Sequence, residues 1–199
     1  MAVKKGHEIP TIDVVLVTIK ATDEANEYAL DTASKIGVNV QTESADAVKL
    51  IVKGRLIAQK PQEVIVTGNQ IILTDNVFNP EIVKILQGGT IKYWTTGDKT
   101  TSGDEDAGFG IASYAPPVVG STEKGKPFIL NAYSAIYSPS GLITGYEKIT
   151  YPNCKGQPVA FNSEDGVFRA PEYTINSAPD VGESPYEITY MDQLPAVTA

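Results

Sequence analysis

The amino-acid sequence predicts a mainly β fold, and three observations indicate it. Turn-forming residues separate several β-rich stretches, and only one segment carries a complete set of helix signals. The third observation is that β-branched and aromatic residues gather in runs, at residues 13–20, 48–56, 64–74, 127–137 and 146–151. We expect two packed sheets flanked by one α-helix, as a β-sandwich or half-barrel.

Two turns are expected between these runs. Gly68 and Asn69 interrupt the stretch at residues 64–74, and a short glycine-containing break between two β-rich runs is typical of a hairpin. The sequence Ser-Pro-Ser-Gly at residues 138–141 separates the two later runs, and this composition predicts a turn.

The expected helix begins after Asn79, which can cap its first turn. Pro80 suits the first helical position, and Glu81 is favourable near the positive end of the helix dipole. Two glycines, Gly88 and Gly89, end the helix. Its apolar stripe consists of Ile82, Val83, Ile85 and Leu86.

Residues 23–35 allow two interpretations. Alanines at helical spacing favour a second short helix, whereas Thr32 and Gly37 weaken it and favour a loop. The polar, glycine-rich stretch at residues 95–110 lacks periodicity and is expected to be a mobile loop, or the tip of a long hairpin that becomes ordered only against a partner. At 199 residues the chain fits a single domain, residues 1–199.

Hydrophobic patterning, cysteine content and net charge disfavour several classes of protein. No apolar run approaches the roughly 18 residues of a membrane span, and no signal peptide is recognisable, so a soluble protein made in a cytoplasm is expected. The single cysteine, Cys154, excludes an internal disulfide. Sixteen basic against 24 acidic residues leave a net charge of −8, which disfavours stable contact with nucleic-acid phosphates.

The stretch Gly120–Lys126 spells GxxxxGK, one residue short of a phosphate-binding loop. Pro127 occupies the place of the Ser or Thr that would bind magnesium, and a strand pattern follows where a helix should begin. A charged turn between strands is therefore the favoured interpretation.

Other candidates for chemistry are weak. Asp98, Asp104, Glu105 and Asp106 lack the ligand spacing of an EF-hand and suggest a solvated acidic loop. His7 is the single histidine and has no assignable partner, and Cys154 suits inert packing better than nucleophilic chemistry. We expect no catalytic, cofactor-binding or metal-binding residues and no enzymatic activity.

Ten tyrosines outnumber five phenylalanines and one tryptophan, a balance that suits surfaces buried on assembly. The alternative is that tyrosines simply line strands. Carbohydrate binding would favour exposed tryptophans, and Trp94 is alone.

Three stretches in a shared order resemble the major tail tube protein family of long-tailed bacteriophages. The first begins VNVQTESADAVK at Val38 and continues to Lys60. The second, TDNVFNPEIVKILQGG, begins at Thr74 and contains the expected helix. The third comprises NCKGQPVAF from Asn153, FRAPEYTINSAP from Phe168, GESPYEI from Gly182 and DQLP from Asp192.

This resemblance implies a structural virion protein that self-assembles into stacked hexameric rings, forming a hollow tail tube. DNA would pass through the lumen without specific binding, and tape-measure, tail terminator and baseplate proteins would be partners. The implied location is the virion tail, after synthesis in the host bacterial cytoplasm. The family also implies extended N-terminal and C-terminal arms, here before Pro10 and after Pro179, with the segments around Gly68 and residues 95–110 as further contacts.

Physical reasoning supports such an assembly, because a ring pairs each open strand edge with that of a neighbour. A β-sandwich binding module for host attachment or carbohydrate is the alternative from another class. A hydrolase with paired carboxylates ranks third, since no pair is singled out by spacing.

Overall fold

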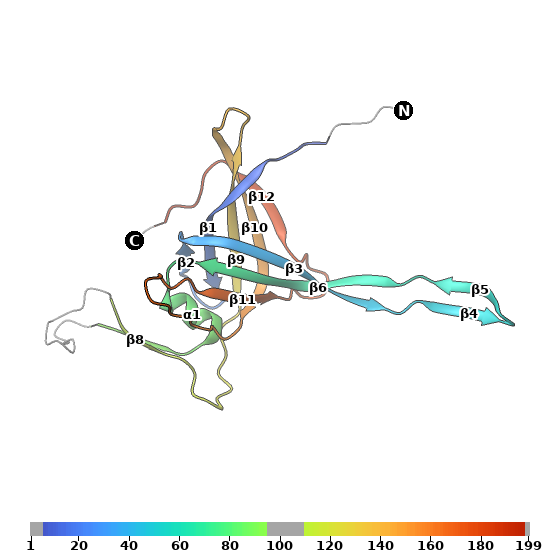
Figure 1. Ribbon diagram of the computed structural model, residues 1–199, viewed down its shortest axis with the longest axis horizontal. Helices are drawn as coiled ribbons and strands as arrows, with labels where there is room; N and C mark the ends of the chain where they lie inside the picture. The colour runs from blue at the N-terminus through green and yellow to red at the C-terminus, as the bar shows by residue number, and fades with distance from the viewer. Residues whose placement is uncertain (1–5, 95–109, 198–199) are drawn as a thin grey trace.

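The computed structural model describes residues 6–94 and 110–197, and it confirms a mainly β fold with one helix in those ranges (Figure 1). The predicted loop at residues 95–110 lies outside the described residues, except for Gly110, as do Asp98, Asp104, Glu105 and Asp106. The elements are β1 (Thr11–Ala21), β2 (Glu27–Leu30), β3 (Ala33–Ala45), β4 (Val48–Val52), β5 (Arg55–Lys60), β6 (Glu63–Asp75), α1 (Pro80–Gln87), β7 (Thr90–Tyr93), β8 (Ile111–Ala115), β9 (Phe128–Tyr137), β10 (Ile143–Gly156), β11 (Glu172–Ser177) and β12 (Glu187–Met191).

Eight strands form one antiparallel sheet in the order β2-β1-β9-β10-β11-β6-β3, with β12 added to β10. The long strand β10 pairs with two different strands along the same edge. Its Tyr146–Thr150 segment pairs with β12, and its Cys154–Gly156 segment pairs with β11. Figure 1 shows β3 and β6 running across the direction of β9 and β10. The sheet therefore folds over into two layers, consistent with the expected β-sandwich.

The hydrophobic core lies between these layers and against the helix. Val17 and Ile19 of β1 and Leu130 of β9 belong to the same buried cluster as Leu73 of β6 and Ile175 of β11. The helix contributes the predicted stripe of Ile82, Val83, Ile85 and Leu86, all buried. No described helix has the length and apolar character needed to cross a membrane.

The helix prediction is confirmed in detail. The side-chain oxygen of Asn79 accepts hydrogen bonds from the backbone N–H groups of Glu81, at 3.0 Å, and Ile82, at 3.2 Å. Pro80 is the first helical residue, and the N–H of Gly88 donates to the carbonyl of Lys84 at the other end. The turn at residues 138–141 is also confirmed, because the N–H of Gly141 donates to the carbonyl of Ser138.

The prediction of a second short helix or a loop at residues 23–35 is wrong for most of that segment. Strand β2 occupies Glu27–Leu30, and β3 begins at Ala33. Pairing with β1, in which Tyr28 faces Ile19, overrides the weak local preference of the alanines. The turn between the two strands is held by Thr32, whose hydroxyl donates to the Asp75 carboxylate at 2.6 Å.

The hairpin predicted at Gly68 and Asn69 is wrong. Strand β6 runs without a break from Glu63 to Asp75, and the register with β3 shifts beside Gly68, which is a β-bulge. A Cβ atom at Gly68 would overlap the carbonyl oxygen of Ser177 on β11. The glycine therefore allows close approach of two backbones instead of a turn.

A hairpin turn does occur earlier in the chain. It lies inside the run at residues 48–56, which was predicted as one strand. Lys53 and Gly54 both have positive φ, at 49° and 77°, and they connect β4 to β5 as a two-residue loop. Two successive positive φ angles are the signature of a type I′ turn, whose twist matches that of paired strands.

A projecting aliphatic arm as the candidate interaction site

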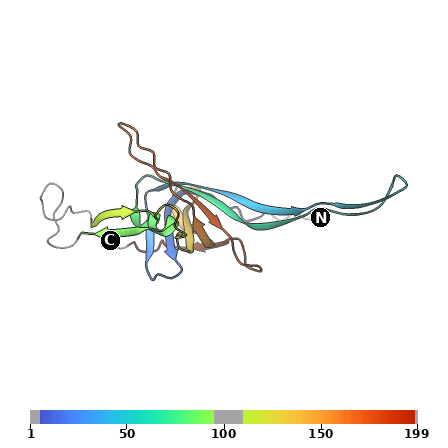
Figure 2. The ribbon, with the colours of Figure 1, turned by 90° about the horizontal axis from the view of Figure 1, so that it is seen from below.

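The most unusual feature of the molecule is a long two-stranded ribbon that leaves the body of the protein (Figures 1 and 2). We define this arm as residues 41–66, which comprise the outer ends of β3 and β6 together with β4 and β5. Its strands pair in two sections, from Thr42 opposite Val66 to Ala45 opposite Glu63 and from Val48 opposite Lys60 to Val52 opposite Arg55, with a break at residues 46–47 and 61–62. Every residue of the arm is exposed.

The arm carries large aliphatic side chains that the body does not cover. Two neighbours, Val64 and Ile65, are each 63% exposed, and as successive residues of a strand they point to opposite faces of the ribbon. Both faces therefore carry uncovered apolar surface. The exposed aliphatic residues of the arm are Val48, Leu50, Ile51, Val52, Leu56, Ile57, Val64, Ile65 and Val66.

An arm of this kind is unfavourable in an isolated chain. Two-stranded ribbons are marginally stable in water without a third strand or a packed face. Contiguous exposed apolar surface marks an interaction site in a soluble protein. The geometry therefore identifies the arm as the candidate site, with another protein surface as the group it would contact.

The near-match to a phosphate-binding loop has a structural explanation. Residues 120–126 run along the C-terminal end of α1, where the N–H of Lys126 donates to the carbonyl of Ile85 at 2.9 Å. A Cβ atom at Gly125 would overlap the carbonyl of Leu86, so this glycine permits the close approach. Carbonyl groups, and not phosphate-binding N–H groups, are presented at that end of a helix.

Lys126 is held by two carboxylates of the β1–β2 connection. Its Nζ lies 2.9 Å from Asp23 and 2.7 Å from Glu24. These contacts raise the pKa of Lys126, chiefly through the hydrogen bond to Glu24, and the bond to Lys126 lowers the pKa of Asp23. The segment therefore joins the helix to the sheet as a charged connection between strands.

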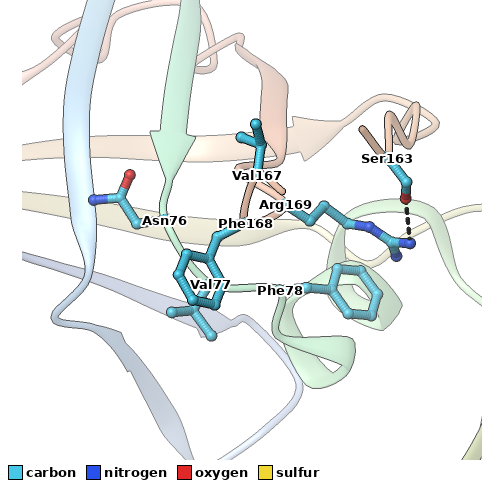
Figure 3. Close-up of a pocket in the computed structure, with 7 residues that line it drawn as sticks. All are labelled: Asn76, Val77, Phe78, Ser163, Val167, Phe168 and Arg169. Carbon is cyan, nitrogen blue, oxygen red and sulfur yellow. Dashed lines mark hydrogen bonds between the residues drawn. The ribbon is translucent and has the colours of Figure 1, made fainter. Parts of the chain in front are cut away.

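A shallow hollow beside the helix is lined by aromatic and apolar side chains (Figure 3). The guanidinium of Arg169 lies 5.9 Å from the centre of the Phe78 ring and 5.5 Å from that of Phe161. It also donates to the hydroxyl of Ser163 at 2.8 Å. The hollow has a volume of about 490 Å³. The residues lining it include no histidine, cysteine or carboxylate.

The remaining sequence candidates are scattered. Cys154 is fully buried and its thiol donates to the carbonyl of Tyr151 at 3.3 Å, while burial raises the pKa of the thiol from 9.0 to about 12. A thiol in this setting is a poor nucleophile. His7 is exposed near the N-terminal end of the described chain, and Trp94 is half-buried at the end of β7.

Sequence reasoning missed the arm as a site because its stretches read as ordinary strands. One available signal was charge, since four basic residues interrupt the aliphatic pattern between Val48 and Lys60. Core strands rarely tolerate unpaired charges. That interruption indicates a solvated ribbon.

Comparisons with known proteins found no match in sequence and a low structural similarity. No protein-family model matches the chain, and no curated protein matches it. Among solved structures, a chain of the 6-fold symmetrised cryo-EM structure of the anti-feeding prophage (AFP) baseplate is similar at 9% sequence identity. The TM-score is 0.33, and the match covers 95% of this chain and 97% of that chain.

Proposed function

We propose that the chain is a structural subunit of a phage-type tail tube, in which six copies close a ring and rings stack into a hollow tube. The observation that carries this proposal is the arm, whose aliphatic side chains are uncovered on both faces. A ribbon in that state needs protein on both sides, as it would have between neighbouring subunits of a closed assembly.

Strand edges supply the second set of contacts. The main sheet ends at β2 and β3, and β12 pairs only with β10 within the described chain. Tyr186, Ile188 and Tyr190 are exposed on and beside β12. Side-by-side pairing of such edges closes rings, and stacking through a different surface extends them along an axis.

The free energy available from covering the arm is comparable to the free-energy cost of association. Its nine large aliphatic side chains are each about half exposed, so covering them would contribute roughly 1 kcal/mol apiece, or about 10 kcal/mol in total. Association itself costs an estimated 4–15 kcal/mol. Edge contacts would add to the favourable side of this balance, and assembly should appear above a threshold concentration.

The negative net charge of the chain is compatible with passage of DNA through the proposed tube. The chain carries a net charge of −8, and an acidic lumen would repel phosphates and let the duplex slide. The subunit would then belong to the virion tail, with DNA in transit and not bound.

Negative-stain electron microscopy across a concentration series tests the proposal. We expect hollow tubes or stacked six-fold rings above the threshold and dispersed subunits below it. A chain that remains monomeric at every concentration would overturn the proposal, and a monomer that binds glycans would favour the attachment-module alternative.

A further inference from the structure

Positive charge is concentrated at the far end of the arm. The arm tip, which we define as residues 48–60, contains Lys49, Lys53, Arg55 and Lys60 and no acidic residue. The tip therefore carries +4, and because the whole chain carries −8, the remaining residues carry −12. Charge separation of this size within one chain predicts electrostatic attraction between copies.

The cations of the tip share surfaces with its aliphatic side chains. Lys60 lies opposite Val48, and Arg55 lies opposite Val52, so each cation shares a face with an aliphatic residue. Lys49 lies opposite Gln59 on the other face. Any partner of the tip must therefore offer both apolar contact and negative charge.

Negative charge is concentrated near the C-terminal end of the chain. We define the acidic stretch as residues 161–192, which contain seven carboxylates and a single basic residue, Arg169. All seven carboxylates belong to exposed residues: Glu164, Asp165, Glu172, Asp180, Glu183, Glu187 and Asp192. This stretch alone accounts for −6 of the −12 outside the tip.

The acidic stretch also offers apolar contact. Phe168 is 94% exposed and Val181 is fully exposed, and both lie between the carboxylates in sequence. The arm projects away from the body (Figures 1 and 2), so these groups are available to the tip of another copy and not to the tip of the same chain. The arm tip and the acidic stretch are therefore complementary in charge, and both offer apolar side chains for contact.

We propose that the basic arm tip of one copy docks against the acidic stretch, residues 161–192, of a neighbouring copy. This inference rests on the proposed self-assembly and specifies which two segments of the chain meet. The two surfaces differ, so the contact is heterologous and can repeat from copy to copy, either around a ring or from one ring to the next. The strongly acidic remainder of the chain, together with the aliphatic residues between the cations, favours a second copy over nucleic acid as the occupant.

A charge exchange tests this pairing with the full chain. The tip-reversed variant carries Lys49→Glu, Arg55→Glu and Lys60→Glu. Two stretch-reversed variants carry Glu164→Lys with Asp165→Lys, or Asp180→Lys with Glu183→Lys. We expect the tip-reversed variant alone to need about tenfold or more higher concentration for assembly. Mixing it with a stretch-reversed variant should restore assembly, since each reversed surface then meets an opposite charge.

A control variant reverses three exposed lysines of the body, through Lys92→Glu, Lys124→Glu and Lys155→Glu, and should assemble as the wild type does. Added salt should raise the assembly threshold of the wild type.

The outcomes separate this inference from the proposed function. Wild-type tubes together with normal assembly of the tip-reversed variant would overturn the docking inference and leave self-assembly intact. The inference would also be overturned if neither stretch-reversed variant restored assembly of the tip-reversed variant. Retention of a DNA duplex by the wild type, lost in the tip-reversed variant while tubes persist, would make nucleic acid the occupant. Absence of wild-type assembly would overturn the proposed function itself.

Discussion

Replacing Leu50, Ile51 and Leu56 together with threonine is expected to prevent tube formation while leaving the isolated chain folded. These side chains are 54%, 60% and 56% exposed, so their loss removes little packing within one copy. Threonine is β-branched, which suits a strand. If assembly covers the three residues, the loss is roughly 3 kcal/mol per copy, which raises the threshold concentration about a hundredfold.

The measurement combines sedimentation of assembled protein with denaturant unfolding of the dispersed chain. A matched control replaces three exposed aliphatic residues of the body, through Val118→Thr, Val119→Thr and Leu142→Thr. The control should assemble near the wild-type threshold. Equal thresholds for the arm variant and the wild type would show that the arm is not covered in the assembly.

Substituting Gly68 with alanine is expected to destabilise the fold by about 1–3 kcal/mol, the range for overpacking a well-packed site. The added Cβ would overlap the carbonyl oxygen of Ser177, and neither backbone can move freely because β6 is paired with both β3 and β11. Asn69 next to it is fully buried and donates to the carbonyl of Pro185 at 3.0 Å. A shift of β6 would disturb this contact as well.

The neighbouring strand offers a matched control in Gly37→Ala. The nearest atom to a Cβ at Gly37, the carbonyl oxygen of Ile72, is 3.9 Å away, which is an ordinary contact. This variant should change the free energy of unfolding by less than about 1 kcal/mol. Urea denaturation of both variants provides the comparison, and similar losses for the two would contradict the close-approach explanation of Gly68.

The sequence predicted those parts of the fold that depend on interactions between residues close together in the chain. Asn79, Pro80 and the glycines after Gln87 act within one helix, and the turn at residues 138–141 closes on itself, so both were found from sequence. The role of Gly68 depends on Ser177, more than a hundred residues away, and no local pattern contains that information. The turn at Lys53 and Gly54 was missed because lysine seldom adopts positive φ.

The candidate site was harder to predict than the fold. An aliphatic strand in the core and an aliphatic strand on an uncovered arm have similar compositions, and only the tertiary structure distinguishes them. Conversely, the strand expected after the GxxxxGK pattern is confirmed as β9, because the strand pattern that follows Pro127 is a local feature. The structure adds that Gly125 is needed for contact with Leu86 of the helix.

Amide hydrogen exchange on dispersed and assembled protein tests the central claim most directly, because it reports on the arm itself. In the dispersed chain, amides of residues 41–66 should exchange faster than those of the central strand β9. The account predicts that assembly strongly slows exchange throughout the arm and leaves β9 unchanged. Equal exchange of the arm in both states would contradict it, since the arm would then lie in solvent in the assembly too.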